Sequence, residues 1–407
     1  MNDHSAPQPP AGSQSLSPET PASNIVVFGF DVAEISQIRR IRALRSLGHS
    51  VQSFTMRRAN MNLDFTPDWP NTHLYNAENE KILKRAFVVA GSIVKMTRHR
   101  QAIQAADMIM ARNLDMLAIA WAARRLARAQ DVPLVYECLD IHDAMTGDGA
   151  KSAAMRRAEK FLLADCAVLA VSSPGFLRNY FEPVQGFTGT SVLLENKLAL
   201  GAATPPRPGL SARPAGTALR LGWVGTIRCR PSFDILLETA RRMGDALEVN
   251  IHGVVHRHVL PDFDARIAEA PNVRYHGPYD YPADLPAVYA GCDLVWSQDL
   301  WQRGRNSDWL LPNRIYEASW AGCPSLAVAG TETGRRIEED GLGWTIPEPS
   351  SAALSGFLTT LPRAAIETRR ADILQMPQEA FVQTDSDMQT VIDLALAAGQ
   401  TARRRAA

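Results

Sequence analysis

The chain has 407 residues, 46% of them hydrophobic, and its 43 lysines and arginines are balanced by 43 aspartates and glutamates. This length exceeds one compact core, so two domains are expected, and the charge balance argues against general nucleic-acid binding. The charges are nevertheless divided, because residues 24–200 hold 22 basic and 17 acidic residues whereas residues 218–397 hold 16 and 24. An anionic surface is therefore expected to contact the first half.

The five cysteines are scattered without a CxxC pair, which predicts free thiols in a reducing compartment and no structural zinc site. No apolar run approaches the ~20 residues that span a bilayer. The N-terminus lacks the basic and apolar regions of a signal peptide. We therefore expect a cytoplasmic protein with a disordered tail over residues 1–23, which are rich in Pro, Ser and Ala.

Short apolar segments alternate with helical patterns through the first half. Strands are predicted at 24–29, from Val51, and at 107–111, 133–137 and 167–172. Helices are predicted at 35–47, 114–129, 151–163 and from Pro174. This alternation is typical of a parallel α/β sheet and defines an N-terminal domain over residues 24–200.

Residues 201–217 carry Pro and Gly without periodicity and predict a linker. Beyond it, strands are predicted at 219–224, 247–252, 273–276, 294–296 and 325–329. Helices are predicted at 232–243, 285–290, 351–361, 364–374 and 387–398, of which the last three are candidates to pack back across the linker. We therefore predict a second doubly wound domain over 218–398, a basic tail over 399–407, and a ligand cleft between the domains.

Residues 306–324, with the sequence NSDWLLPNRIYEASWAGCP, are the most informative segment. Pro312 lies near the start of a predicted helix and Gly322 at its end, as is usual for helices. The free amides at such a helix start bind anions, and Glu317, one turn later, is placed to accept hydrogen bonds from two ribose hydroxyls. The segment therefore indicates a nucleotide sugar. The alternative is an ordinary helix-to-strand connection with Glu317 in solvent.

Several segments, taken in order, resemble the GT-B glycosyltransferases, specifically the family-4-type enzymes of bacterial polysaccharide assembly. These segments are LRSLGHSV (44–51), LGWVGTIR (221–228), NVRYHGPY (272–279), AVYAGCDL (287–294), residues 311–324 and GLGW (341–344). The resemblance implies two Rossmann-like domains facing a cleft, and retaining sugar transfer from a nucleoside diphosphate sugar. The chain departs from the family in two places. Trp309 stands where the family has the first of two glutamates, with Asp308 the nearest carboxylate, and the first glycine-rich loop keeps only Gly29.

The leaving pyrophosphate must be neutralised, and no DxD-like acidic pair follows a strand, so arginines and helix amides are expected in place of a metal cofactor. Arg228, just after the Gly225 turn, is the first candidate, because a guanidinium binds two phosphate oxygens; the alternative is a surface arginine. The predicted donor-binding residues are Gly225, Arg228, Tyr279, Arg305, Asn313 and Glu317.

The loop after the strand at 133–137 carries Asp140, His142 and Asp143. At the carboxyl end of a parallel strand these side chains face the cleft, where they are candidates to orient the acceptor hydroxyl or take its proton. The alternative is a loop cap with a solvated histidine. Asp31 and Glu34, after the first strand, are the candidate acceptor contacts.

Residues 81–100 combine an apolar middle with six basic residues, which predicts a helix lying on an anionic membrane surface. The predicted membrane-binding residues are Lys81, Lys84, Arg85, Lys95, Arg98 and Arg100. The alternative is a core helix with charged ends. On the first interpretation the protein is peripherally attached to the inner face of the cell membrane.

The sequence therefore predicts a glycosyltransferase that moves a sugar from a nucleoside diphosphate sugar to a polyprenyl-diphosphate-linked glycan or another saccharide acceptor in exopolysaccharide assembly. Two alternatives stay open. One is a nucleotide-sugar epimerase on the same fold, which would need no lipid acceptor. The other is a degenerate donor-binding subunit, suggested by the missing first glutamate and the reduced glycine loop.

Overall fold

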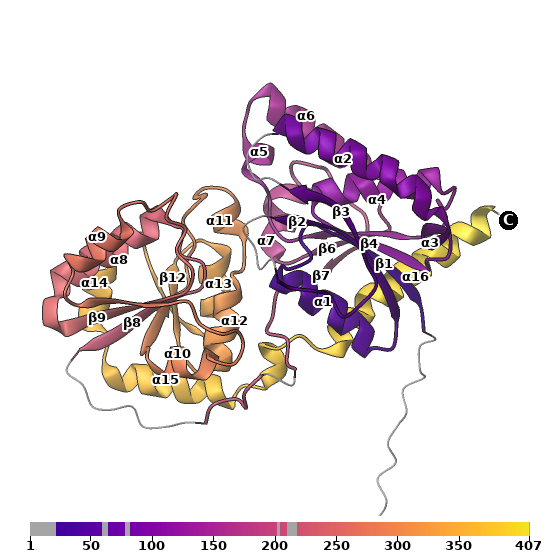
Figure 1. Cartoon of the computed structure of the whole chain (residues 1–407). Coiled ribbons are helices and arrows are strands. Elements are labelled where there is room, and N and C mark those ends of the chain that lie inside the picture. Colours follow the sequence, from indigo (N-terminus) through magenta and orange to yellow (C-terminus); the bar gives the residue numbers. More distant parts are fainter. Residues whose placement is uncertain (1–21, 59–63, 78–81, 202–203, 210–217, 407) are drawn as a thin grey trace, which may run out of the picture.

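The computed structural model describes residues 22–58, 64–77, 82–201, 204–209 and 218–406. Within these residues the chain forms two parallel β-sheets, each covered by helices on both faces (Figure 1). The predicted α/β fold with two doubly wound halves is therefore confirmed. None of the helices in the described ranges is long and apolar enough to cross a membrane.

The first sheet has seven strands in the order β3-β2-β1-β4-β5-β6-β7. Its strands are β1 (Asn24–Gly29), β2 (Ser50–Arg58), β3 (Asn71–Ala77), β4 (Met108–Arg112), β5 (Leu134–Cys138), β6 (Val168–Val171) and β7 (Ser191–Leu193). Every residue of β4, β5 and β6 is buried, as expected for parallel strands with helices on both faces. The two edge strands, β3 and β7, are more exposed and were not predicted.

The helices of this half are α1 (Ile35–Ser46), α2 (Ile82–Met96), α3 (Arg100–Gln104), α4 (Leu114–Leu126), α5 (Asp143–Thr146), α6 (Ala150–Leu163) and α7 (Pro174–Phe176). Helices α2, α4 and α6 lie on one face of the sheet and α1 lies on the other (Figure 1). Each face has its own apolar core. Predicted helix ends differ from these bounds by a few residues, except that the helix from Pro174 is short and continues as a π-helix, Leu177–Phe181.

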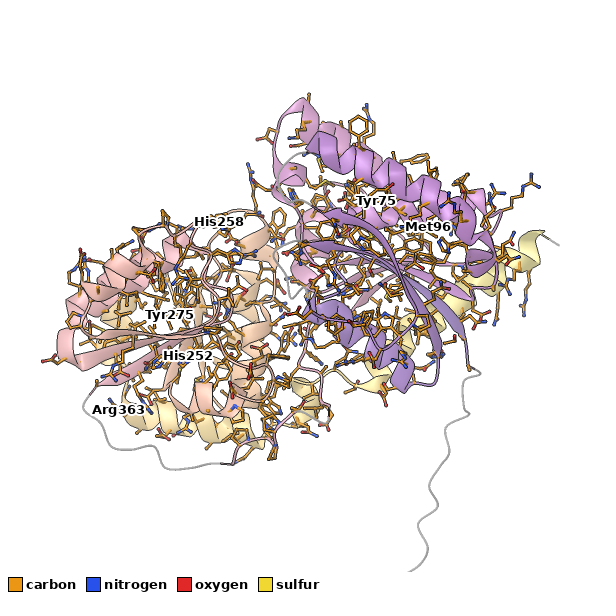
Figure 2. The ribbon with its side chains drawn as sticks, viewed as in Figure 1. Tyr75, Met96, His252, His258, Tyr275 and Arg363 are labelled. Atoms are coloured by element: carbon orange, nitrogen blue, oxygen red, sulfur yellow. The ribbon has the colours of Figure 1, made fainter. Side chains whose placement is uncertain are left out.

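The second sheet has six strands in the order β10-β9-β8-β11-β12-β13. Its strands are β8 (Leu219–Val224), β9 (Leu247–His252), β10 (Val273–Gly277), β11 (Leu294–Trp296), β12 (Ser325–Val328) and β13 (Gly343–Ile346). The helices of the second half are α8 (Arg230–Met243), α9 (Phe263–Ala268), α10 (Leu285–Ala290), α11 (Asn306–Trp309), α12 (Asn313–Trp320), α13 (Glu332–Glu339), α14 (Ser351–Thr360), α15 (Arg363–Gln375) and α16 (Asp385–Ala406). Figure 2 shows how side chains fill both halves, with Met96 in the first core and Tyr275 against a core of the second.

The last helix, α16, returns to the first sheet (yellow in Figure 1). Its apolar stripe of Met388, Val391, Ile392 and Ala395 is buried in the same core as residues of β1 and β4. The predicted second domain, 218–398, therefore needs a correction, because its last helix packs with the first sheet. The predicted basic tail, 399–407, continues this helix as far as Ala406.

Specific contacts fix the two halves relative to each other. The Arg178 side chain of the first half binds Glu332 of the second. The Ser173 hydroxyl donates to the backbone carbonyl of Trp309 at 2.5 Å, and the Trp309 and Leu310 side chains pack against the first core. Trp309, which stands where the family that the sequence resembles has its first glutamate, therefore takes part in the contact between the halves.

Candidate functional site

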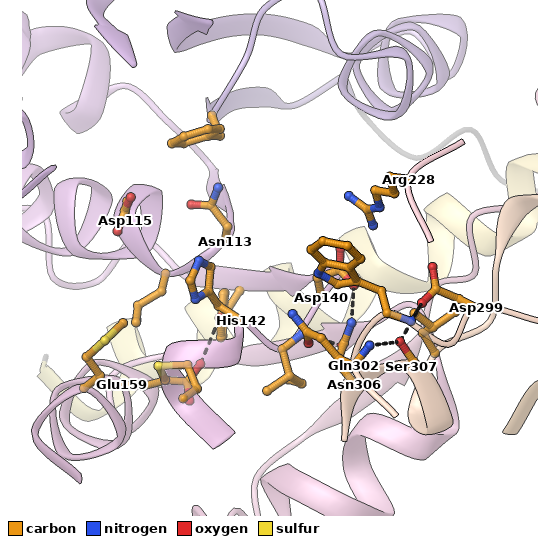
Figure 3. Close-up of a pocket in the computed structure, with 18 of the residues that line it drawn as sticks. Asn113, Asp115, Asp140, His142, Glu159, Arg228, Asp299, Gln302, Asn306 and Ser307 are labelled. Carbon is orange, nitrogen blue, oxygen red and sulfur yellow. Dashed lines mark hydrogen bonds between the residues drawn. The ribbon is translucent and has the colours of Figure 1, made fainter. Parts of the chain in front are cut away.

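A cavity of about 450 Å³ lies between the two halves (Figure 3). The first half contributes residues that follow β1, β4 and β5, and the second contributes residues that follow β8 and β11 together with part of α11. These are the carboxyl ends of parallel strands, where ligands of open α/β sheets bind. The cavity is therefore the candidate active site.

Arg228 lies in this cavity, in the turn that follows β8. The turn begins at Gly225, whose φ of 111° favours glycine. The Arg228 side chain is exposed and makes no hydrogen bond or ion pair with any residue that the structure describes. Arg230, two residues later, is instead bound to Asp262. Arg228 is therefore the guanidinium that is available to an anionic ligand.

Asp140 lines the same cavity as Arg228, in the loop after β5 (Figure 3). The Asn306 amide nitrogen donates to the Asp140 carboxylate at 2.8 Å, and the Asn306 amide oxygen accepts from the backbone nitrogen of Ile141 at 2.8 Å. Desolvation by the surrounding protein raises the pKa of Asp140. The hydrogen bond from Asn306 and the charge of Arg228 lower this pKa, but their effects are smaller. A carboxyl with a raised pKa beside a cationic group is a candidate for proton exchange or for orienting a hydroxyl.

The other two candidate catalytic residues occupy the same loop but differ in position. His142 lines the cavity, and its Nδ1 accepts a hydrogen bond from the backbone nitrogen of Ala144 at 3.1 Å at the start of α5. Asp143 is exposed and pairs with Arg305 of the second half at 3.4 Å. Neither Asp143 nor Arg305 lines the cavity. The structure therefore brings Asp140, His142 and Arg228 together and places the Asp143–Arg305 pair beside them.

Glu317 lies on α12 and is only 7% exposed. Its carboxylate is 3.4 Å from the Tyr289 hydroxyl, and burial raises its pKa against the smaller effects of Arg39 and Arg314. Arg314 approaches the Gly225 turn, because a Cβ atom added at Gly225 would lie 4.0 Å from the Arg314 Nη2. Glu317 does not line the cavity, but Arg314, whose charge affects Glu317, comes close to the Gly225 turn that carries Arg228.

Tyr279 and Asn313 lie on the Glu317 side of this turn. Tyr279 is half-buried, and its pKa is raised by burial and by the charge of Glu317. Asn313 is the first residue of α12, four positions before Glu317, which places both on one helix face. Of the six predicted donor residues, Arg228 lines the cavity and Arg305 lies beside it, paired with Asp143. Gly225, Asn313, Glu317 and Tyr279 lie outside the cavity lining.

The two predicted acceptor contacts lie outside the cavity lining. Asp31 is fully buried, and its carboxylate binds Arg58 at 2.9 Å and the backbone nitrogen of Ala33 at 3.0 Å. Glu34 is half-buried and accepts a hydrogen bond from the Ser36 hydroxyl at 2.9 Å. The carboxylate of Asp31 is thus engaged in holding the first loop.

Most residues that line the cavity were not predicted, among them Asn113, Asp299 and Asn306. Asn113 follows β4 with a φ of 76°, and its side chain caps α4. Asp299 follows β11, and Asn306 begins α11. A polar residue just beyond an apolar strand was the available signal for Asn113 and Asp299, whereas nothing in the sequence indicated that Asn306 contacts the first half.

The six predicted membrane-binding residues fall into three groups. Lys81 and the side chains of Lys84 and Arg85 lie outside the described residues. The Lys95 ammonium donates to the backbone carbonyls of His73 and Leu74, so it is used within the fold. Arg98 and Arg100 are exposed.

In the described part of the chain, no group of three His, Cys, Asp or Glu side chains is arranged to hold a metal ion. The independence from a metal cofactor stays a prediction. The five cysteines are free thiols.

Two doubly wound sheets that face a cavity between them define the fold of this protein as GT-B. The structure is similar to Anabaena HepE in complex with UDP and glucose, with a TM-score of 0.65, 15% identity and coverage of 90% of this chain and 98% of that one. It is also similar to WaaG, a glycosyltransferase involved in lipopolysaccharide biosynthesis, with a TM-score of 0.62, 15% identity and coverage of 91% and 99%.

The sequence gives the closer assignment. No model of a known protein family matches the chain. The chain is 32% identical over 340 residues to the succinoglycan biosynthesis protein ExoL of Rhizobium meliloti (strain 1021), which covers 83% of this chain and 84% of that one. The chain therefore belongs to the family of this succinoglycan biosynthesis protein.

Proposed function

We propose that this glycosyltransferase moves a sugar from a nucleoside diphosphate sugar to a saccharide of a growing cell-surface polysaccharide, carried on a polyprenyl diphosphate. The position of Arg228, free and facing the cavity between the halves, is the observation that carries the proposal. Two further findings support it: the related protein is named for succinoglycan biosynthesis, and the similar HepE structure holds UDP and glucose.

The proposed chemistry follows from where charge develops. As the anomeric bond breaks, negative charge builds on the leaving phosphate, and Arg228 neutralises it without a metal cofactor. Glu317 accepts hydrogen bonds from the ribose hydroxyls behind the Gly225 turn. In a retaining transfer, which the resemblance to family 4 favours, the leaving phosphate itself takes the proton of the acceptor hydroxyl. Asp140 and His142 then orient that hydroxyl, so losing either one reduces the rate without abolishing it.

Helix α2 supports attachment to the inner face of the cell membrane. Phe87 is 79% exposed and Val94 is 69% exposed, and their spacing of seven residues places them on one helix face. Val88, Val89 and Ile93 pack against the first core. An exposed apolar stripe followed by Arg98 and Arg100 suits a helix lying at an anionic lipid surface, where each basic residue contributes about 1 kcal/mol.

A thermal-shift panel of UDP-, GDP- and ADP-sugars, followed by turnover assays, tests the proposed function. We expect one nucleotide sugar to stabilise the protein selectively, and its nucleoside diphosphate to be released only when a lipid-linked glycan is added. Release of an epimer without acceptor would favour the epimerase, and stabilisation without turnover would favour the donor-binding subunit. A protein that no nucleotide sugar stabilises would contradict the proposal.

A further inference from the structure

Asp299 presents a carboxylate to the cavity from the second half, three residues beyond the end of β11 (Figure 3). One of its oxygens, Oδ1, accepts from the Ser307 hydroxyl at 2.5 Å and from the backbone nitrogen of Trp301 at 2.9 Å. Ser307 is almost fully buried, and its own oxygen accepts from the backbone nitrogen of Gln302 at 2.7 Å. The orientation of the Asp299 carboxylate is therefore fixed by its own loop.

The second oxygen of Asp299, Oδ2, receives no hydrogen bond from the residues that the structure describes. Asp299 is close enough to Asp140 to affect its ionisation, and Arg228 affects the same carboxyl. Arg228, Asp140 and Asp299 therefore border a single cavity. A diphosphate bound by Arg228 would bring its attached sugar next to the carboxylates.

Asp308, the other carboxylate of this loop, does not have this position. Its Oδ2 accepts from the backbone nitrogen of Gly304 at 2.8 Å, and it does not line the cavity. Trp309, which stands where family members have a glutamate, packs against the first core. Of these three residues, Asp299 alone offers a carboxylate to a ligand in the cavity.

We infer that Asp299 binds hydroxyl groups of the donor sugar and selects a neutral hexose over a hexuronate. The inference rests on the proposed function. A carboxylate accepts hydrogen bonds from sugar hydroxyls, and a hydrogen bond to a charged acceptor is stronger than one to a neutral group. A uronate would add a negative charge to a cavity that Asp140 and Asp299 border, and this repulsion discriminates against it.

Calorimetric titration of Asp299→Asn tests the inference, with Asp308→Asn as the matched control from the same loop. UDP, GDP and ADP are titrated first, to find which nucleoside diphosphate the parent binds. That diphosphate, its glucose derivative and its glucuronate derivative are then titrated into the parent and each variant. We expect the parent to prefer the glucose derivative over the glucuronate by about tenfold. Asp299→Asn should weaken binding of the glucose derivative about tenfold or more and leave the free diphosphate within twofold.

The outcomes separate this inference from the proposed function. The inference is wrong, while the donor site stands, if Asp299→Asn binds the glucose derivative as tightly as the parent does. It is also wrong if the variant loses affinity equally for the glucose derivative and for the free diphosphate. If the parent binds none of the diphosphates, both are wrong. Ser307→Ala is a second test in case the Asp299 variant misfolds, because it keeps the carboxylate but removes a hydrogen bond that orients it. It should lower the affinity for the glucose derivative and leave the affinity for the free diphosphate unchanged.

Discussion

Replacing Arg228 with alanine should weaken nucleoside diphosphate binding without affecting the fold. A hydrogen bond to a charged group contributes about 1.5–3 kcal/mol. The Arg228 side chain is exposed in an open cavity, where solvent screens its charge, so the lower end of that range applies. We expect a loss of about 1.5–2 kcal/mol, which is roughly a 10- to 30-fold increase in Kd. The thermal midpoint should stay unchanged, because the side chain has no hydrogen-bonding partner among the described residues.

The assay is calorimetric titration of the nucleoside diphosphate into parent, Arg228→Ala and Arg230→Ala. Arg230, two residues later at the start of α8, is a matched control, because its guanidinium is held by Asp262 at 2.5 Å and does not line the cavity. Arg230→Ala should lower stability by no more than about 1 kcal/mol, as for other exposed ion pairs, and should keep the parent affinity. Parent affinity in Arg228→Ala, or an equal loss in both variants, would refute the assignment of Arg228.

Three further predictions concern other parts of the molecule. Glu317→Ala should weaken nucleotide-sugar binding at least tenfold, about 1.4 kcal/mol or more, and an unchanged Kd would remove Glu317 from the site. The buried Glu137 carboxylate lies 2.8 Å from Arg40 and from a second arginine. Glu137→Gln should lower the free energy of unfolding by about 3–5 kcal/mol, as measured by urea denaturation. Burial alone would raise the pKa of Glu137, but the two arginines lower it overall. Its stabilisation should therefore be complete above the ordinary glutamate pKa of about 4.3 and be lost as the pH falls through the lower pKa of the folded state; a variant with the parent's acid stability would contradict this. Changing Phe87 and Val94 together to serine should release the protein from anionic vesicles in sedimentation assays, and equal sedimentation of variant and parent would end the membrane proposal.

The strands at the centre of both sheets were predictable because helices cover both of their faces. Residues 24–29 and 219–224 read as apolar runs, and they form β1 and β8. The edge strand β3 has the sequence NTHLYNA, which carries too few apolar residues to be recognised. Helix α16 was predicted as a helix, but periodicity identifies an apolar stripe without identifying the sheet that buries it.

The candidate site was predictable where residues follow the carboxyl end of a strand within one sheet, because ligands of parallel sheets bind there. Asp140 and His142 follow β5 and Arg228 follows β8, and all three line the cavity. Contacts between the halves could not be predicted, because they depend on how the two sheets face each other. Asn306, which binds the backbone of Ile141 across this interface, is the clearest example.

The central claim is that the leaving diphosphate is bound by Arg228 and the Gly225 turn. A crystal structure with the bound nucleoside diphosphate tests it most directly. We expect phosphate oxygens within hydrogen-bonding distance of the Arg228 guanidinium, the ribose hydroxyls at Glu317, and no metal ion joining the phosphates to protein carboxylates. A diphosphate bound away from Arg228, or held to the protein through a metal ion, would contradict the account.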